Sequence, residues 1–219
     1  SLFWENSQKN IIQSQKRTFL KTHNALVAFN NRSFATAKTT LGAIYIIRDP
    51  RNILSSLKNH YGFKDYNETF EFMKNKKKYI WDIRKKNDYS GFQFLGSWSD
   101  HYKSWTKNPK FKTLLIKYED LEKDCYSTSH KIIKFILMLN GQNIELDEKK
   151  LFRSIETTKF DVLKKKEIDL GFEESIKIND VKRSFFFLGP ENNWKSLPKE
   201  ILSKVENEFK DDLNYFNYL

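Results

Sequence analysis

The stretch GAIYIIRDPRN, residues 42–52, decides the fold class of this 219-residue chain. Its first part, Gly42–Ile47, is apolar and rich in isoleucine, which predicts a strand buried on both faces. Asp49 then suits a helix N-cap and Pro50 the first helical position, so we expect a helix from there to about His60. A buried strand that passes directly into a helix is typical of α/β sheets.

Outside this stretch, strand and helix patterns alternate. Lys112–Lys117 predicts a second strand and Thr18–Lys21 a short one, while Phe70–Ile83 has the spacing of an amphipathic helix. We find no hairpin signal, internal repeat or break in composition. The alternation therefore predicts one α/β domain over residues 1–219, in which helices flank a mainly parallel sheet in three layers.

This topology places several polar and charged side chains at one edge of the sheet. Ligands of parallel sheets bind at the carboxyl ends of the strands. Because each of them follows a predicted strand, Lys21–His23, Arg48 and Tyr118 are expected on the same rim.

Composition narrows the class of partner. The chain has 39 Lys and Arg against 28 Asp and Glu, a net charge of +11, which favours an anionic partner such as a nucleotide, nucleic acid, sulfated glycan or acidic lipid. The single cysteine, Cys125, excludes an intrachain disulfide and a cysteine-rich zinc site. No apolar run reaches the length of a membrane span, and the cytoplasm is the expected location.

The most basic segment, Lys74–Lys86, carries Tyr79 and Trp81 among its lysines and arginines. Two interpretations stay open. The segment is the solvated face of a packed helix, or its rings stack on nucleic-acid bases beside the positive charges.

Arg48 is a candidate anion-binding residue. It follows a buried strand and precedes a helix N-terminus, where a guanidinium and free backbone amides both bind anions. The alternative is an ion pair with Asp49 or Asp120.

Lys21 and His23 are candidate catalytic residues. Two positions apart on an extended segment, they point to the same side, so that one can neutralise a transferring anion while the other takes a proton. The alternative for His23 is a surface or hydrogen-bonded core histidine. The other three histidines, His60, His101 and His130, have no metal-ligand spacing, so we assign them no chemistry and predict no metal.

Two further segments suit a nucleotide. Tyr118-Glu119-Asp120-Leu121 ends a strand, where a ring can stack on a purine. Gly189 follows an aromatic run and permits close approach of backbone amides to a ligand. The sequence has no Gly-x-x-x-x-Gly-Lys-Ser/Thr loop, which argues against a conventional ATPase or kinase.

In their order and spacing, these segments resemble the sulfotransferases that use 3′-phosphoadenosine 5′-phosphosulfate (PAPS). The likeness extends from about Thr18 to the C-terminus. Its motifs are Lys21-Thr22-His23, Arg48-Asp49-Pro50-Arg51-Asn52 with Ser56, the helix from Gly96 to Trp105, Tyr118-Glu119-Asp120-Leu121, Thr158-Lys159-Phe160 and the segment from Gly189 to Lys195.

The resemblance implies a P-loop-type α/β sulfotransferase fold and an activity. The activity is transfer of a sulfuryl group from PAPS to a hydroxyl or amine acceptor, without a metal, leaving adenosine 3′,5′-bisphosphate (PAP). It implies that His23 is the catalytic base and that Lys21 lies beside the transferring group. The acceptor is a small molecule or a glycan, and the sequence does not choose between them or predict the oligomeric state.

The same resemblance implies a set of nucleotide-binding residues. Arg48 and Ser56 would hold the 3′-phosphate. Tyr118, Thr158 and Phe160 would surround the adenine, and backbone amides near Gly189 would complete the phosphate site.

The chain departs from the family pattern in two places. The 5′-phosphosulfate loop belongs a few dozen residues before Lys21, and the 20 residues before it contain none, so we expect an N-terminally incomplete domain. In the closing motif, Phe187-Leu188 replace an Arg-Lys pair and Asn192 replaces a second glycine. Lys182 and Arg183, just upstream, are candidates to replace the lost charge, and the spacing does not show that either reaches the phosphate. Without compensation, we expect weaker nucleotide binding.

Two other functions stay open at this point. An inactive or truncated relative would bind the nucleotide and transfer nothing. A basic module for nucleic acid or glycan would explain the charge but not the ordered motifs, and nucleic acid is the less favoured partner.

Overall fold

The computed structural model describes residues 2–81, 91–107, 110–178 and 181–219. The chain divides into two compact units: unit 1 comprises Ser1–Tyr45 and Phe72–Leu115, and unit 2 comprises Ile46–Glu71 and Ile116–Leu219. No helix among the described residues is both long and apolar enough to cross a membrane. The single domain over residues 1–219 stays a prediction.

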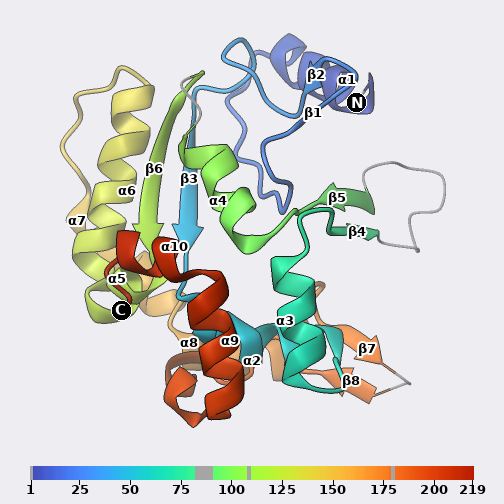
Figure 1. The fold of residues 1–219 in the computed structure, drawn as a ribbon. Coiled ribbons are helices and arrows are strands. Elements are labelled where there is room, and N and C mark those ends of the chain that lie inside the picture. The colour runs from blue at the N-terminus through green and yellow to red at the C-terminus, as the bar shows by residue number, and fades with distance from the viewer. Residues whose placement is uncertain (1, 82–90, 108–109, 179–180) are drawn as a thin grey trace. The chain divides into compact units, whose positions relative to one another are not determined.

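Two parallel strands run through both units. β3 (Gly42–Ile47) and β6 (Lys112–Lys117) are hydrogen-bonded neighbours, and Figure 1 shows their arrows pointing the same way. Both strands are confirmed as predicted, and with the helices they confirm the α/β class. The prediction that β3 is buried on both faces is wrong, because Ile47 is 2% exposed but Ile46 is 53% exposed. Neighbouring residues of a strand point to opposite faces, so one face of β3 is packed and the other open.

Among the described residues, three antiparallel strand pairs, which we call hairpins, accompany this pair, and the sequence analysis missed them. The first joins β1 (Ala28–Phe29) to β2 (Arg32–Ser33) through Asn30 and Asn31, whose φ angles are 50° and 61°. Asparagines with positive φ are a signal for a tight hairpin turn. The other two hairpins join β4 (Tyr79–Trp81) to β5 (Phe92–Phe94) and β7 (Ile176–Ile178) to β8 (Val181–Arg183).

Unit 1 also contains α1 (Leu2–Gln13) and α4 (Trp98–Thr106). Its core is aromatic: the ring of Phe34 lies 5.1 Å from that of Trp4 and 6.3 Å from that of Trp105. The predicted strand Thr18–Lys21 is wrong. The segment is exposed and has no strand partner in the described chain, and a short strand is not stable without one.

The predicted helix Phe70–Ile83 is also wrong in its second half, part of which lies outside the described residues. α3 (Tyr66–Lys74) ends at Lys74. There the side chain of Asn75 accepts a hydrogen bond from the backbone of Lys77 at 2.9 Å, in a turn that leads into β4. Asparagine favours turns because its side chain binds its own backbone two residues on.

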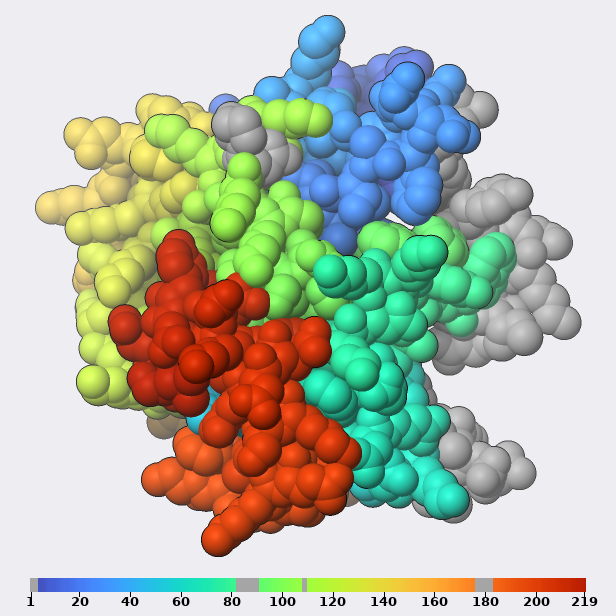
Figure 2. Space-filling view, in the orientation of Figure 1, coloured from blue at the N-terminus to red at the C-terminus, as the bar shows by residue number. Residues whose placement is uncertain are grey.

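Unit 2 is mainly helical. α2 (Pro50–Tyr61) is confirmed, with Asp49 as its N-cap and Gly62 in the left-handed region, φ 64°, at its end. Leu54, Val205 and Leu213 are fully buried at its core. The first part of α3, up to Glu71, also belongs to unit 2. The helices that lie wholly within it are, besides α2, α5 (Tyr118–Lys123), α6 (Cys125–Leu139), α7 (Glu148–Thr157), α8 (Phe160–Leu170), α9 (Lys199–Glu208) and α10 (Lys210–Tyr215), with 3₁₀ turns η2 (Gly189–Glu191) and η3 (Trp194–Ser196). Figure 2 shows α9 and α10, in red, as one continuous surface.

Candidate functional site

Arg48 and Tyr118 lie together where β3 and β6 end. The Arg48 Cζ is 4.1 Å from the Tyr118 ring centroid, so their predicted proximity is confirmed. Arg48 Nη2 is 3.7 Å from Glu122 Oε1, too long for a hydrogen bond, and the side chain is 17% exposed. Its buried Nε has no hydrogen-bond partner in the described part of the chain. A buried donor without an acceptor is destabilising, so this side chain fits an anionic ligand.

Arg51, one turn further on, is used differently. It is 3% exposed, and its guanidinium donates to Asp49 at 2.7 and 3.0 Å, to Glu206 at 2.9 Å and to the Tyr218 carbonyl at 2.6 Å. Asp49 therefore pairs with Arg51 and not with Arg48. Of the two arginines in the segment from Arg48 to Asn52, Arg51 is fully used in contacts within the fold, whereas Arg48 has a donor left for a ligand.

The closing segment docks on α2 and reaches Ser56. The Trp194 backbone N–H donates to Asn52 Oδ1 at 2.9 Å, and Asn192 Nδ2 donates to the Asn52 carbonyl at 2.8 Å. Asn192 Nδ2 also lies 3.4 Å from Ser56 Oγ, and Asn192 Oδ1 is buried with no partner among the described residues. Sequence reasoning gave Asn52 no role, although it stands within the quoted motif.

Gly189 and Phe160 are in direct contact. Gly189 has φ 53°, and a Cβ there would lie 2.4 Å from the Phe160 ring. The glycine therefore allows close approach of the backbone to an aromatic side chain, and its predicted contact with a ligand stays a prediction. Thr158, two residues before Phe160, donates its hydroxyl to the Ser154 carbonyl at 2.7 Å at the end of α7.

Of the two candidates to replace the missing Arg-Lys pair, the structure describes the side chain of only one, Arg183. The side chain of Lys182 lies outside those that the structure describes. Arg183 has a buried Nε without a hydrogen-bond partner in the described ranges. Phe187, at one of the two substituted positions, is 46% exposed.

Glu167 of α8 is a buried carboxylate that sequence reasoning missed. It is 3% exposed, and its carboxylate accepts from Ser184 Oγ at 2.8 Å, from the backbone N–H groups of Phe185 and Phe186 at 2.7 and 2.9 Å, and from Ser175 Oγ. Burial raises the pKa of Glu167, but these hydrogen bonds outweigh it and lower the pKa to about 2. The carboxylate thus ties the chain after β8 to α8, where the Phe186 ring lies 6.0 Å from Phe160.

Lys21 and His23 lie in unit 1, at the end of the exposed segment Thr18–Lys21 that was predicted as a strand and just after it. Their place on the rim beside Arg48 stays a prediction. The next residue, Asn24, is 6% exposed and fixed from two sides: its Oδ1 accepts from the Phe94 N–H at 2.8 Å, and its carbonyl accepts from Trp105 Nε1 at 2.9 Å. The exposed pair is therefore anchored immediately after His23.

His101 fixes the backbone of His23. Its Nε2 lies 3.0 Å from the His23 carbonyl, and its Nδ1 lies 2.7 Å from the Tyr45 hydroxyl. Burial lowers the pKa of His101, so the neutral ring donates from Nε2 to the carbonyl and accepts at Nδ1 from Tyr45. Sequence reasoning gave His101 no chemistry. Only the fold brings it to His23, which lies 78 residues away.

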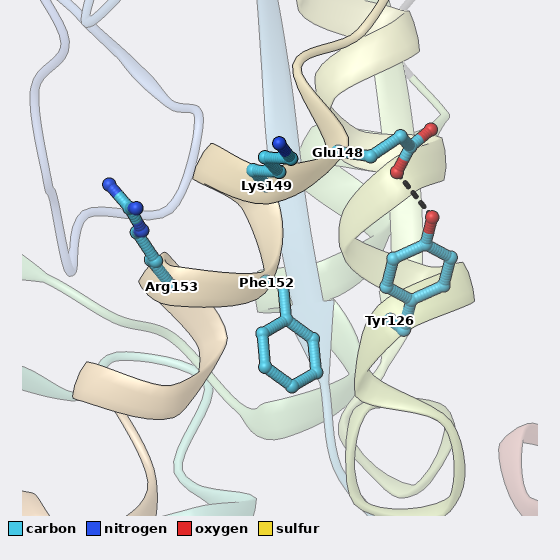
Figure 3. Close-up of a pocket in the computed structure, with 5 residues that line it drawn as sticks. All are labelled: Tyr126, Glu148, Lys149, Phe152 and Arg153. Carbon is cyan, nitrogen blue, oxygen red and sulfur yellow. Dashed lines mark hydrogen bonds between the residues drawn. The ribbon is translucent and has the colours of Figure 1, made fainter.

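A shallow depression lies elsewhere on unit 2, between α6 and α7 (Figure 3). Tyr126, Glu148, Lys149, Phe152 and Arg153 line it, and the Tyr126 hydroxyl donates to the Glu148 carboxylate. No predicted site residue lines this depression. In the described ranges, no group of three or more His, Cys, Asp or Glu side chains is placed to hold a metal ion.

The chain matches known proteins over most of its length. The family model described as sulfotransferase domain matches residues 3–216. Sulfotransferase 2A1 of Mus musculus is 28% identical over 143 residues, and sulfotransferase 2A2 of the same species 29% identical over 143 residues. Each alignment covers 63% of this chain and 44% of the relative, so the match spans less than half of these proteins.

A solved structure agrees with the predicted fold. The crystal structure of retinol dehydratase in a complex with retinol and PAP has a TM-score of 0.53 and 21% sequence identity to this chain. The superposition covers 81% of this chain and 48% of that one. At this identity the likeness concerns the fold alone.

Proposed function

Because this chain belongs to the sulfotransferase domain family, we propose that it transfers a sulfuryl group from PAPS to an acceptor hydroxyl or amine. The observation that carries the proposal is Arg48. Its Nε is buried without a partner among the described residues, between a strand end and a helix N-terminus. A helix N-terminus and an arginine donor together favour a phosphate group.

The nucleotide-binding residues all lie in unit 2. We assign the 3′-phosphate to Arg48 and Ser56, and the adenine to Tyr118, Thr158 and Phe160. Asn192 Oδ1 and the backbone at Gly189 are further candidates to contact the nucleotide. The fit of this set to PAPS is supported by the unpartnered polar atoms of Arg48 and Asn192.

The chemistry is assigned to unit 1. PAPS, when bound, supplies the sulfuryl group. His23 takes the proton from the acceptor hydroxyl as the acceptor oxygen attacks sulfur, and the Lys21 ammonium offsets the charge that develops as PAP departs. His101 acts as a positioning residue, because it holds the His23 carbonyl.

The test is calorimetric titration with PAP, with ADP as the control nucleotide. We expect PAP to bind in preference to ADP, and Arg48→Ala to weaken PAP binding by about 10- to 100-fold, the usual effect of losing hydrogen bonds to a charged group. Arg153→Ala, an exposed arginine of the same unit, is the matched control and leaves the affinity unchanged. Equal binding of both nucleotides, or no effect of Arg48→Ala, would contradict the proposal.

A second measurement separates the enzyme from an inactive relative. Transfer of labelled sulfuryl from PAPS to a panel of hydroxyl acceptors is expected from the enzyme. PAP binding without any transfer would favour a relative that only binds the nucleotide.

A further inference from the structure

One face of the β4–β5 hairpin is aromatic. The strand register pairs Tyr79 with Phe94 and Trp81 with Phe92, and residues that are directly opposite or two apart share a face. The Phe92 ring lies 5.4 Å from that of Tyr79 and 5.9 Å from that of Trp81. Tyr79 is 54% exposed and Trp81 49%. We call these four side chains the aromatic face.

The aromatic face lies in the positively charged part of the chain. Unit 1 has 17 Lys and Arg against 4 Asp and Glu, a net charge of +13, and unit 2 has 22 against 24, a net charge of −2. Lys76 and Lys77 are exposed on the turn that leads directly into β4. A field of this sign attracts an anionic partner to unit 1.

The backbone of β5, the strand that carries Phe92 and Phe94, is hydrogen-bonded to the segment of the proposed base. The Phe94 N–H donates to Asn24 Oδ1 at 2.8 Å, and the Ala25 N–H donates to the Phe94 carbonyl at 2.7 Å. Asn24 directly follows His23. The aromatic face is therefore carried by a strand whose end is bound to the residue next to the proposed base.

We propose that the aromatic face binds the acceptor and that this acceptor is an acidic carbohydrate. The requirement for a hydroxyl rests on the proposed function. The excess of lysine and arginine selects negative charge, and the electron-rich faces of Tyr79 and Trp81 suit the C–H faces of sugar rings. A single-stranded nucleic acid fits less well. The Phe92 ring is inclined by 32° to Tyr79 and by 72° to Trp81, so the rings form no parallel slots for planar bases.

The experiment measures binding of a heparin hexasaccharide to the full chain by calorimetry, without nucleotide. Maltohexaose, which is neutral, and a single-stranded dodecathymidylate are the comparison ligands. The variant is Tyr79→Ala with Trp81→Ala, and its matched control is Phe152→Ala with Tyr215→Ala, two exposed aromatic residues of unit 2. We expect the first double variant to lower the affinity for the hexasaccharide by about tenfold or more and the control to leave it unchanged.

Two lysine double variants test the same inference in case the aromatic double variant does not fold. Lys76→Ser with Lys77→Ser is expected to weaken binding of the hexasaccharide several-fold. Lys165→Ser with Lys166→Ser removes the same charge from exposed positions of unit 2 and is expected to have no effect. Equal effects of the two lysine pairs would overturn the inference, because binding would then follow net charge alone.

Three further outcomes are decisive. Tight binding of maltohexaose, or unchanged binding by a folded aromatic variant, overturns the inference. Ring-dependent binding of the oligonucleotide as tight as that of the hexasaccharide assigns the face to nucleic acid instead. PAP titrations run in parallel separate the two proposals. If the chain does not bind PAP but binds the hexasaccharide in a ring-dependent way, only the proposed function is overturned. If the chain binds PAP but its hexasaccharide binding does not depend on the rings, only this inference is overturned.

Discussion

The two units differ in how their charged side chains are placed: unit 2 pairs charges in its interior, and unit 1 exposes basic residues. In unit 2, with its net charge of −2, buried charges are neutralised inside the fold: Arg51 by Asp49 and Glu206, and Glu167 by four donors. In unit 1, with +13, most lysines and arginines are exposed and have few carboxylates to pair with. Internal pairing fixes geometry, whereas a surface with a high net positive charge attracts anionic ligands. The comparison favours a rigid nucleotide site in unit 2 and an acceptor site in unit 1.

The largest expected effect separates catalysis from nucleotide binding. Replacing His23 by Ala removes the proposed base, and kcat for sulfuryl transfer is expected to fall about 10²- to 10⁴-fold. PAP affinity, which depends on unit 2, is expected to stay within about twofold. His130→Ala, a partly exposed histidine of unit 2, is the control for kcat. A parallel loss of PAP affinity in His23→Ala would contradict the division between the units.

The next effect concerns the stability of unit 2. Glu167→Gln replaces a carboxylate that accepts four hydrogen bonds, and urea unfolding is expected to show a loss on the order of 3 kcal/mol at pH 7. The pKa of Glu167 is lowered to about 2 in the folded chain, so its contribution is complete above its ordinary pKa and declines as the pH falls towards 2. The wild type and the variant should therefore converge in stability between about pH 4.5 and pH 2.

Glu173→Gln, at an exposed position just after α8, is the matched control for that series. It is expected to change the free energy of unfolding by less than about 0.5 kcal/mol. A constant gap between wild type and Glu167→Gln at all pH values would mean that the carboxylate is not the ionised acceptor described here.

The sequence predicted what depends on local chemistry. The strand Gly42–Ile47, the N-cap Asp49 and the helix from Pro50 follow from neighbouring residues, whereas the anion site at Arg48 stays a prediction. Thr18–Lys21 failed because an extended segment becomes a strand only if another strand pairs with it. The helix over Phe70–Ile83 failed because the turn at Asn75 outweighed the amphipathic spacing.

Contacts between distant segments were beyond sequence reasoning. His101 reaches the His23 carbonyl across 78 residues, and Asn192 reaches Asn52 across 140. Glu167 looked like one of many charged residues on a helix, because nothing in its neighbours shows that it is buried. The pair Asn30-Asn31 is itself a sequence signal for the turn of hairpin β1–β2, so the absence of a hairpin signal was predicted wrongly at this place.

A smaller effect is expected at Gly189. Gly189→Ala places a Cβ 2.4 Å from the Phe160 ring in addition to a φ of 53°, and should destabilise unit 2 by about 2–3 kcal/mol. Gly141→Ala has a similar φ of 65°, and beyond its chain neighbours no atom of the described residues lies within 4 Å of the added Cβ, so only the backbone cost of about 1 kcal/mol is expected. Thermal unfolding and PAP titration measure both. If the two variants behave alike, the contact with Phe160 has no energetic consequence.

The smallest effect tests the positioning of His23 from within unit 1. Tyr45→Phe removes the donor to His101 Nδ1 and leaves the rest of the ring contact, in which the ring centroids are 5.6 Å apart. Losing one neutral hydrogen bond costs about 1 kcal/mol, which corresponds to a fall in kcat of about fivefold if the bond orients His101 on the His23 carbonyl. KM for PAPS should not change, because no residue assigned to the nucleotide lies in unit 1. Tyr215→Phe, on an exposed tyrosine of unit 2, controls for the loss of a hydroxyl. A change in KM without a change in kcat would show that Tyr45 acts on nucleotide binding, and the separation of roles between the two units would then be wrong.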